Sequence, residues 1–297
     1  MGLLFGAKLS ANADTVLIGH NPSHVREIQE KGVTVREGER TLHYAMKAAV
    51  NGECHEPADL IILFTKAYQN DDALKDSRDL IGENTYVLTL QNGMGHEGVL
   101  SRHVRMDHVL IGMTEQGSSK EGICSIVHSG TGTTSFARAQ GTKGSETDSE
   151  RLNEFCRVFE ASGFPCSISE NIRYMIWNKL MINASSSVLS GVLQKPQGYV
   201  AENEWAWSIC RDLIREICET ASGEEFEFDV QEQTERIYRH LNRAKNGYTS
   251  VYADLKYGRK TEADYISGAV VKAAEAQGKT VPAQSLILRL LHAMEQQ

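Results

Sequence analysis

The hydrophobic positions of the chain form short continuous runs in its first half and helical stripes in its second half. Residues 15–19, 59–65, 85–90 and 108–113 are short apolar runs. Such runs are typical of strands that are covered on both faces of a parallel sheet. Amphipathic helical stretches separate several of them, and this alternation predicts a doubly wound α/β fold.

Local patterns add further elements to this sheet. Residues 2–12 have the apolar spacing of a helix. Residues 33–44 alternate in period two around Glu37-Gly38, which predicts a hairpin. Residues 123–137 predict antiparallel strands that turn at Gly130–Gly132.

The pattern changes after residue 167, because everything from about residue 170 onward has helical character. We therefore expect an α/β domain over residues 1–167 and an all-helical domain over residues 168–297. Two domains also suit the 297-residue length, since domains usually contain about 100–200 residues.

A dinucleotide-binding fingerprint is expected between the first strand and the first helix of such a fold. Gly93–Gly98 match G-x-G-x-x-G, but their strand lies too late in the sheet. Gly2 instead has the position of the last fingerprint glycine, while the first strand and the first two glycines are absent. We expect a Rossmann-like sheet that lacks its first strand here, either because the start is set a few residues late or because the chain is truncated.

The residues after the strand at 15–19 bear on the choice of cofactor. An Asp or Glu there would bind a ribose 2′-hydroxyl and repel a 2′-phosphate. His20 stands in that place, and no acid follows until Glu27, which favours NADP over NAD. Asn92 is a second candidate for cofactor contact, since an amide can both donate and accept. The alternative is a simple Asn92-Gly93 turn.

Residues 171–189 form a helix that is apolar nearly all round, which predicts burial. Lys179 lies on one apolar stripe of this helix, with Asn183 one turn later. A buried ammonium group needs a partner, so Lys179 is a candidate for chemistry. A lysine that extends from a helix edge to solvent is the alternative. Glu262 is expected in the first turn of a helix capped by Thr261.

Composition excludes several classes of function. The net charge is −8 with no basic block, so nucleic acid is a poor partner. No apolar run approaches the roughly 18 residues of a membrane span. The six cysteines form neither C-x-x-C nor a metal-ligand cluster. They predict buried reduced thiols in a cytosolic (cytoplasmic) protein without a metal site.

Several segments resemble the ketopantoate reductase (2-dehydropantoate 2-reductase) family, in order along nearly the whole chain. The family's most specific signature is similar to residues 249–271, in which Ser250 and Glu262 are twelve positions apart. The other similar segments are "GLLFGAKL", "TKAYQ" at 65–69, "LQNGMG" at 90–95 and "WNKLMINASSSVLSGVL".

The resemblance implies a Rossmann domain and a helical domain with the active site in the cleft. It also implies NADPH-dependent reduction of 2-dehydropantoate to pantoate. Lys179 would protonate the ketone oxygen, and Glu262 would bind the substrate hydroxyl. Family members are often dimers, so a homodimer is expected. The remaining implied residues are Asn183, Ser250 and Asp254 around the substrate, and Gly2, His20, Lys66 and Asn92 around the cofactor.

The chain departs from the family pattern in the same regions. His20 replaces the usual arginine, Ser187 replaces an asparagine, and Gln197 replaces an asparagine on the substrate side. The longer amide of Gln197 keeps open a different bulky 2-oxo acid as substrate. The absent strand and glycines keep open a nucleotide-binding regulator or an inactive remnant.

Overall fold

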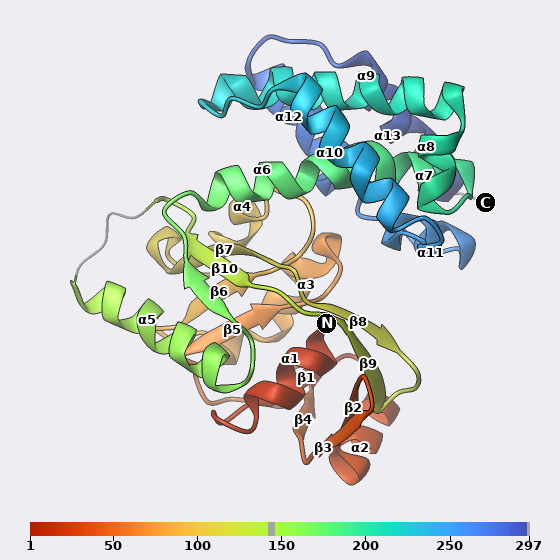
Figure 1. Cartoon of the computed structure of the whole chain (residues 1–297). Helices are drawn as coiled ribbons and strands as arrows, with labels where there is room; N and C mark the ends of the chain where they lie inside the picture. The colour runs from red at the N-terminus through yellow and green to blue at the C-terminus, as the bar shows by residue number, and fades with distance from the viewer. Residues whose placement is uncertain (142–145, 296–297) are drawn as a thin grey trace. The chain divides into compact units, whose positions relative to one another are not determined.

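The computed structural model describes residues 1–141 and 146–295, and the chain divides into two compact units (Figure 1). The α/β unit comprises Met1–Gln91 and His96–Ile172. The helical unit comprises Asn92–Gly95 and Arg173–Gln297. Every strand that the structure describes belongs to the α/β unit. The predicted fold class, an α/β region followed by a helical region, is confirmed.

A five-stranded sheet in the order β11-β10-β7-β6-β5 forms the centre of the α/β unit. β5, β6 and β7 run parallel, whereas β10 is antiparallel to β7 and parallel to β11. Side chains of helix α5 (Glu146–Ala161) pack on this sheet in one apolar core with Leu88, Leu110 and Phe136. The strands are β5 (Leu60–Leu63), β6 (Tyr86–Thr89), β7 (Val109–Thr114), β10 (Thr134–Arg138) and β11 (Cys166–Ile168).

A second sheet has the order β3-β2-β9-β8. Its β2–β3 hairpin, with Glu37 opposite Arg40, confirms the prediction for residues 33–44. The predicted pairing within residues 123–137 is wrong, because β9 pairs with β2 and β8 while β10 pairs with β7 and β11. The strands are β2 (Val33–Glu37), β3 (Arg40–Tyr44), β8 (Gly117–Lys120) and β9 (Ser125–Gly130).

Strand β1 (Val16–Gly19) pairs in parallel with β4 (Lys47–Val50) in a separate two-stranded sheet. The five-stranded sheet ends at β5, and no described strand joins β5 to β1. Helix α1 (Gly2–Leu9) packs against both edges: the Phe5 and Phe64 rings lie 4.8 Å apart, and Gly6 lies against Leu17. Helix α1 therefore contacts both the β1–β4 pair and the end of β5.

A polar link fixes α1 to the second sheet. The Nζ atom of Lys8 lies 2.7 Å from Oε1 of Glu37, and Nδ1 of His128 lies 2.7 Å from the same oxygen. Partial burial alone would raise the pKa of Glu37, but the hydrogen bonds from Lys8 and His128 hold that pKa below its ordinary value. The link therefore orients α1 through charge as well as through apolar packing.

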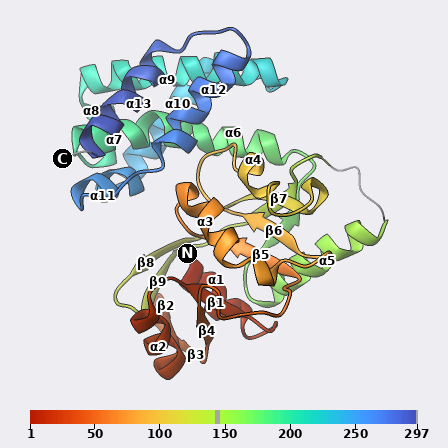
Figure 2. The same ribbon diagram turned by 180° about the vertical axis from the view of Figure 1, so that it is seen from behind.

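The other helices of the α/β unit cover its sheets or connect their strands. Helix α2 lies beside β4 (Figure 2), where Nε2 of Gln29 donates to the carbonyl of Ala48 at 2.7 Å. It ends at Gly32, which has a φ of +64° and at which an added Cβ atom would lie 2.3 Å from the Tyr44 carbonyl oxygen. These helices are α2 (Pro22–Lys31), η1 (Ala67–Gln69), α3 (Asn70–Asp76), η2 (Arg78–Leu80), α4 (Glu97–Leu100) and η3 (Met106–His108).

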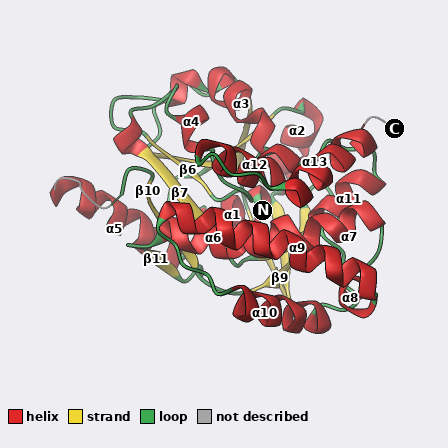
Figure 3. Ribbon diagram, turned by 90° about the horizontal axis from the view of Figure 1, so that it is seen from above, coloured by secondary structure: helices red, strands yellow, loops and turns green. Residues whose placement is uncertain are grey.

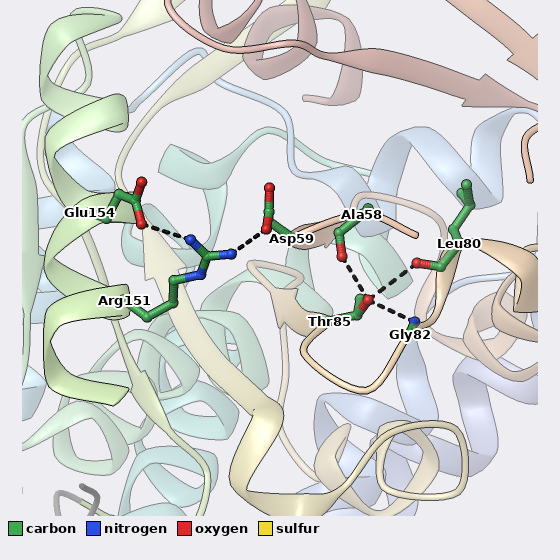
Figure 4. Close-up of polar contacts among 7 residues, drawn as sticks. All are labelled: Ala58, Asp59, Leu80, Gly82, Thr85, Arg151 and Glu154. Carbon is green, nitrogen blue, oxygen red and sulfur yellow. Dashed lines mark hydrogen bonds and ion pairs between the residues drawn. The ribbon is translucent and has the colours of Figure 1, made fainter. Parts of the chain in front are cut away.

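Polar contacts hold the amino ends of β5 and β6 (Figure 4). The Thr85 hydroxyl donates to the Ala58 carbonyl at 2.6 Å and accepts from the Gly82 amide at 2.9 Å. Arg151 of α5 pairs with both Glu154 and Asp59, the residue before β5. The polar groups at this amino edge therefore bond to one another. Ligands of doubly wound folds bind at the opposite, carboxyl edge of the strands.

The helical unit is drawn without any yellow strand in Figure 3. One face of helix α9 packs into its core, with Cys210, Leu213, Ile214 and Ile217 fully buried. Pro282 begins the last helix, as predicted. The helices are α6 (Ile172–Ile182), the π-helical turn η4 (Asn183–Ser187), α7 (Val188–Leu193), α8 (Gln197–Glu202), α9 (Glu204–Ala221), η5 (Ser222–Glu224), α10 (Val230–Arg243), α11 (Ser250–Lys256), η6 (Ala263–Tyr265), α12 (Ser267–Ala276) and α13 (Pro282–Glu295).

The cysteines follow the prediction in part. All six are free, but only Cys156, Cys210 and Cys218 are buried, and the other three are half-buried. Burial raises the pKa of Cys210 to about 12, so this thiol stays protonated and behaves as an apolar side chain.

Candidate active site

Two predicted cofactor residues, Gly2 and His20, belong to the α/β unit. Gly2 is the first residue of α1 and packs against Phe64, just beyond β5. His20 is exposed directly after β1. The next residue, Asn21, caps α2 by accepting from the Ser23 amide at 3.0 Å. Glu27, the first acid downstream, is paired with Lys31 at 2.9 Å. No carboxylate of the loop after β1 therefore occupies the position that would bind a ribose 2′-hydroxyl.

A compact cluster of amides lies at the carboxyl ends of β5 and β6. The side chains of Asn70 and Gln91 donate to each other, both at 2.9 Å. Thr65 donates to the Asn70 oxygen at 2.9 Å, and its carbonyl accepts from Gln91 at 2.6 Å. Asn70 is fully buried. Lys66 follows Thr65 and is half-buried, so the cluster holds the backbone that presents Lys66 at this edge.

The loop that follows β6 is part of the helical unit. The Met94 amide donates to the Tyr265 carbonyl at 3.0 Å. Gly93 has φ +92°, and a Cβ atom there would lie 2.2 Å from the same carbonyl oxygen, so only glycine permits this approach. The structure therefore brings Asn92 together with the segment just after Glu262. The sequence places them far apart, and the glycine pattern at 93–98 was the signal for this contact.

Helix α6 carries Lys179 on a half-buried face together with Met175 and Ile176. The fully buried stripe is the opposite one, which contains Trp177 and Leu180. The prediction that the lysine stripe is buried is therefore wrong, because the helical core covers the tryptophan side of α6. Lys179 keeps partial access to solvent, as a group that meets a substrate requires.

Helix α6 passes into the π-helical turn η4 at Asn183, which is half-buried. The Val188 amide reaches back to the Asn183 carbonyl, five positions earlier, rather than to Ala184. Serine hydroxyls support this irregular stretch: Ser185 donates to the Met181 carbonyl at 2.5 Å, and Ser186 donates to the Ile182 carbonyl at 3.2 Å. The sequence analysis missed this turn, although a run of three serines with weak helix propensity is a signal for it.

Helix α11 is attached to the π-helical turn. Thr249 caps α11 by accepting from the Tyr252 amide at 3.1 Å, and its hydroxyl contacts the Ser187 carbonyl at 3.2 Å. Gly191 of α7 packs so closely on Val251 that an added Cβ atom would lie 2.5 Å from its side chain. The exposed Ser250 is thereby fixed relative to the end of the helix that carries Lys179 and Asn183.

Two further substrate candidates belong to α11 or to a segment that contacts the loop before it. Asp254 is buried on α11 and pairs with Arg259 at 3.0 Å. Gln197 is half-buried at the start of α8, and its backbone N–H donates to the Gly247 carbonyl at 2.9 Å. Gly247 comes three residues before Ser250. The backbone contact thus joins the segment of Gln197 to the segment that leads into Ser250.

Glu262 is buried, but it does not lie in the first turn of α12 as predicted. It precedes the short 3₁₀ turn η6, and α12 begins only at Ser267. The neighbouring residue Thr261 donates to Glu295 through its amide at 2.7 Å, and His292 contacts Glu295 and Asp264, both at 3.1 Å. The end of α13 therefore holds the backbone on both sides of Glu262.

Known proteins are similar to this chain over nearly its whole length. The family model described as "Ketopantoate reductase PanE/ApbA" matches residues 1–141, and "Ketopantoate reductase PanE/ApbA C terminal" matches residues 171–295. The 2-dehydropantoate 2-reductase of Lactococcus lactis subsp. lactis (strain IL1403) is 31% identical over 302 residues, which cover 100% of this chain and 95% of that protein. The chain belongs to the ketopantoate reductase family.

Solved structures extend the comparison. D-mandelate dehydrogenase in a ternary structure with NADH and anilino(oxo)acetate has a TM-score of 0.89 and 28% identity, over 98% of this ketopantoate reductase family member and 94% of that chain. Dimeric ketopantoate reductase from Staphylococcus aureus has a TM-score of 0.80 over 99% and 94% of the two chains, and its 19% identity supports a shared fold alone.

The family is one of oxidoreductases, and the family together with the NADH-bound neighbour points to a nicotinamide cofactor. The α/β unit offers groups that fit an anionic dinucleotide. The amino end of the eight-residue α1 carries the positive end of a helix dipole, and Lys66 adds a positive charge. None of the helices within residues 1–141 and 146–295 is both long and apolar enough to cross a membrane.

Proposed function

We propose that the protein reduces 2-dehydropantoate to pantoate with NADPH, in the cytoplasm and on the route to pantothenate and coenzyme A. The observation that carries the proposal is the α6–η4 helix of a ketopantoate reductase family member, with Lys179 and Asn183 half-buried one turn apart. Residues 1–167 would bind the cofactor, and residues 168–297 would bind the substrate.

Each candidate residue of the helical unit has a role in this reaction. The nicotinamide, when bound, supplies a hydride to the keto carbon. The Lys179 ammonium polarises the ketone oxygen and gives it a proton, so the product is the 2-hydroxy acid. Glu262 accepts a hydrogen bond from the substrate hydroxyl. Asn183 and Ser250 donate to the remaining polar groups of the substrate, and Asp254 supports them through its position on α11.

The cofactor residues support NADPH over NADH. Gly2 allows close approach to the start of α1, while Lys66 and Asn92 contact the cofactor at the carboxyl edge. The loop after β1 that contains His20 carries no carboxylate. The first acid downstream, Glu27, lies in α2 and is paired with Lys31. A 2′-phosphate would meet no charge repulsion from that loop. A homodimer is the expected assembly, and analytical ultracentrifugation would check it.

A second candidate is the reduction of another bulky 2-oxo acid. Gln197 stands where the family resemblance leads us to expect a shorter amide, which changes the shape available to the acyl group. The neighbour D-mandelate dehydrogenase was solved with anilino(oxo)acetate, a 2-oxo acid with an aromatic substituent. This likeness favours a pocket in the family fold that accepts groups larger than those of 2-dehydropantoate.

Steady-state kinetics would separate these candidates. Oxidation of NADPH and of NADH is measured with 2-dehydropantoate, phenylglyoxylate and smaller branched 2-oxo acids. The proposal expects the highest kcat/KM for 2-dehydropantoate with NADPH. A higher value for phenylglyoxylate would select the second candidate. Saturable NADPH binding without turnover of any 2-oxo acid would favour a nucleotide-binding regulator, and no binding would favour an inactive remnant.

A further inference from the structure

We propose that Gln284 is a positioning residue, which holds the π-helical turn η4 and through it directs Asn183 toward the substrate. The inference rests on the proposed function, because it assigns a partner to the segment that carries Asn183. Gln284 lies on α13, a hundred residues beyond Ala184, and it is fully buried. Neither its sequence context nor the resemblance singles it out.

The need for such a residue follows from the backbone of η4. In an uninterrupted α-helix the Val188 amide would donate to the Ala184 carbonyl. It is directed to the Asn183 carbonyl instead, which deprives Ala184 of its α-helical partner. The Nε2 atom of Gln284 donates to the Ala184 carbonyl at 2.9 Å, so the glutamine replaces the donor that the π-helical turn removes.

The orientation of the Gln284 amide is fixed by its surroundings. Its nitrogen faces two carbonyl oxygens, those of Ala184 at 2.9 Å and of Leu213 at 3.5 Å. The backbone N–H of Gln284 donates to Oε2 of Glu216 on α9 at 2.8 Å. Gln284 is therefore anchored on one side while its side chain reaches the turn on the other.

The other end of the Gln284 amide argues against a purely stabilising role. Its Oε1 atom is buried and lacks a hydrogen-bond partner among the described residues. An unsatisfied buried acceptor destabilises the fold, so an apolar residue would serve packing as well or better. A glutamine at this position makes sense when its donor is needed, and the carbonyl that needs it directly follows Asn183.

The position of η4 makes small displacements matter. One extra residue in a turn rotates everything before it relative to everything after it, so the turn sets how Lys179 and Asn183 on one side relate to Ser187 on the other. Thr249 holds the far end of the same turn through the Ser187 carbonyl at 3.2 Å. Gln284 and Thr249 thus fix the turn at two points, while Ser250 follows directly after Thr249.

The test compares two glutamines of the helical unit. Gln284→Met keeps the length of the side chain and removes the donor. Gln277→Met is the matched control, because Gln277 also donates to a helix carbonyl, that of Thr220 at 2.8 Å, and also buries an unpaired Oε1 atom. Kinetics with the preferred 2-oxo acid and binding of NADPH are measured for both variants.

We expect Gln284→Met to lower kcat/KM by about 10- to 100-fold, since small misplacement of substrate-contacting groups has effects of this size. NADPH affinity should not change. Gln277→Met should retain wild-type kcat/KM. Wild-type kinetics in Gln284→Met, or an equal loss in Gln277→Met, would overturn the proposal.

A third variant tests the donor itself. In Gln284→Glu a protonated carboxyl can still donate to the Ala184 carbonyl, whereas an ionised carboxylate repels it. Its activity relative to the wild type should therefore recover as pH falls, and a constant ratio would contradict the proposal. Amide hydrogen exchange gives a readout without activity: exchange over residues 183–192 should accelerate in Gln284→Met and not in Gln277→Met. If the wild type reduces no 2-oxo acid, the proposed function fails, and unchanged exchange would independently refute the role of Gln284.

Discussion

The carboxyl edge of β5 and β6 and the π-helical turn η4 satisfy their polar groups in opposite ways. At the strand edge the side chains of Thr65, Asn70 and Gln91, which follow the strands directly or begin the next helix, satisfy one another through hydrogen bonds. At η4 the backbone is irregular, and side chains from elsewhere, those of Thr249 and Gln284, complete it. The first arrangement is closed upon itself, whereas the second depends on distant helices. The strand edge should therefore govern stability, and the turn should govern the geometry of the substrate groups.

The largest expected effect is on the chemical step of the helical unit. Lys179→Ala should lower kcat by about 10²- to 10⁴-fold, because general acid catalysis contributes on that scale. NADPH binding should persist, since the strand edge is untouched. Stopped-flow turnover and NADPH fluorescence titration measure the two quantities. Lys272→Ala, on an exposed position of α12, is the control. Normal turnover in Lys179→Ala would remove lysine from the chemistry.

The next effect separates stability from catalysis. Asn70→Ala removes from a fully buried position the side chain that bonds to both Thr65 and Gln91, which should lower the free energy of unfolding by about 1–3 kcal/mol. Differential scanning calorimetry measures the change. Asn51→Ala removes one weak contact, at 3.4 Å to Asp76, and should have little effect. Equal destabilisation by both variants would show that the Thr65–Asn70–Gln91 cluster contributes no more to stability than one surface contact does.

A smaller effect concerns substrate affinity in the helical unit. Glu262→Gln preserves shape but loses a charged acceptor, and hydrogen bonds to charged groups contribute about 1.5–3 kcal/mol. We expect KM for the 2-oxo acid to rise by about tenfold or more, with kcat and NADPH affinity nearly unchanged. Initial-rate kinetics at saturating NADPH decide it. A change in NADPH affinity alone would show that Glu262 acts on the cofactor side.

The smallest effect is a pH dependence near Glu262. The hydrogen bond to Glu295 raises the pKa of His292, with burial opposing it and Asp264 adding to it. A raised histidine pKa stabilises the fold below the unfolded pKa, near 6.5, and that contribution is lost as pH rises through the folded value. Because His292 is partly exposed, screening limits the effect to less than about 1 kcal/mol.

This pH effect can be observed selectively in the helical unit. The three tryptophans, Trp177, Trp205 and Trp207, all belong to that unit, so their fluorescence in urea reports its unfolding. The urea midpoint should fall slightly between about pH 6 and pH 8, a range that spans the ordinary histidine pKa, and His292→Gln should abolish the difference. An increase in the midpoint over that range would contradict the assignment.

The fold could be predicted from sequence where one strong local signal decides an element. The period-two pattern of residues 33–44 and the Pro282 start of α13 were sufficient. The pairing of β9 with β2 could not be predicted in this way, because it depends on where the β2–β3 hairpin, remote in the sequence, packs in the folded chain. Local patterns cannot report such tertiary choices.

The candidate site was predictable in its residues more than in their supports. Lys179 and Asn183 were named from a helical stripe and Glu262 from the helix start after Thr261, whereas Ser250 was named from the resemblance to the family signature. The π-helical turn was missed, because a helical stripe continues through it with one residue added. Gln284 and Thr249 were missed as partners, since hydrogen bonds that span 100 and 62 residues leave no trace in a local window. The half-burial of Lys179 also depended on which side of α6 the core selects.

The loop of residues 92–95 has a consequence for how the protein can be divided. Because these residues belong with the helical unit while the chain on both sides belongs to the α/β unit, the polypeptide crosses between the units at 91/92, at 95/96 and at 172/173. A protease cut after Ile172 would leave residues 92–95 on the fragment of the α/β unit, although they belong with the helical unit and Met94 donates to the Tyr265 carbonyl. An expressed fragment that begins at Arg173 would lack Asn92 and expose the Tyr265 carbonyl, so the two halves are better studied in one chain.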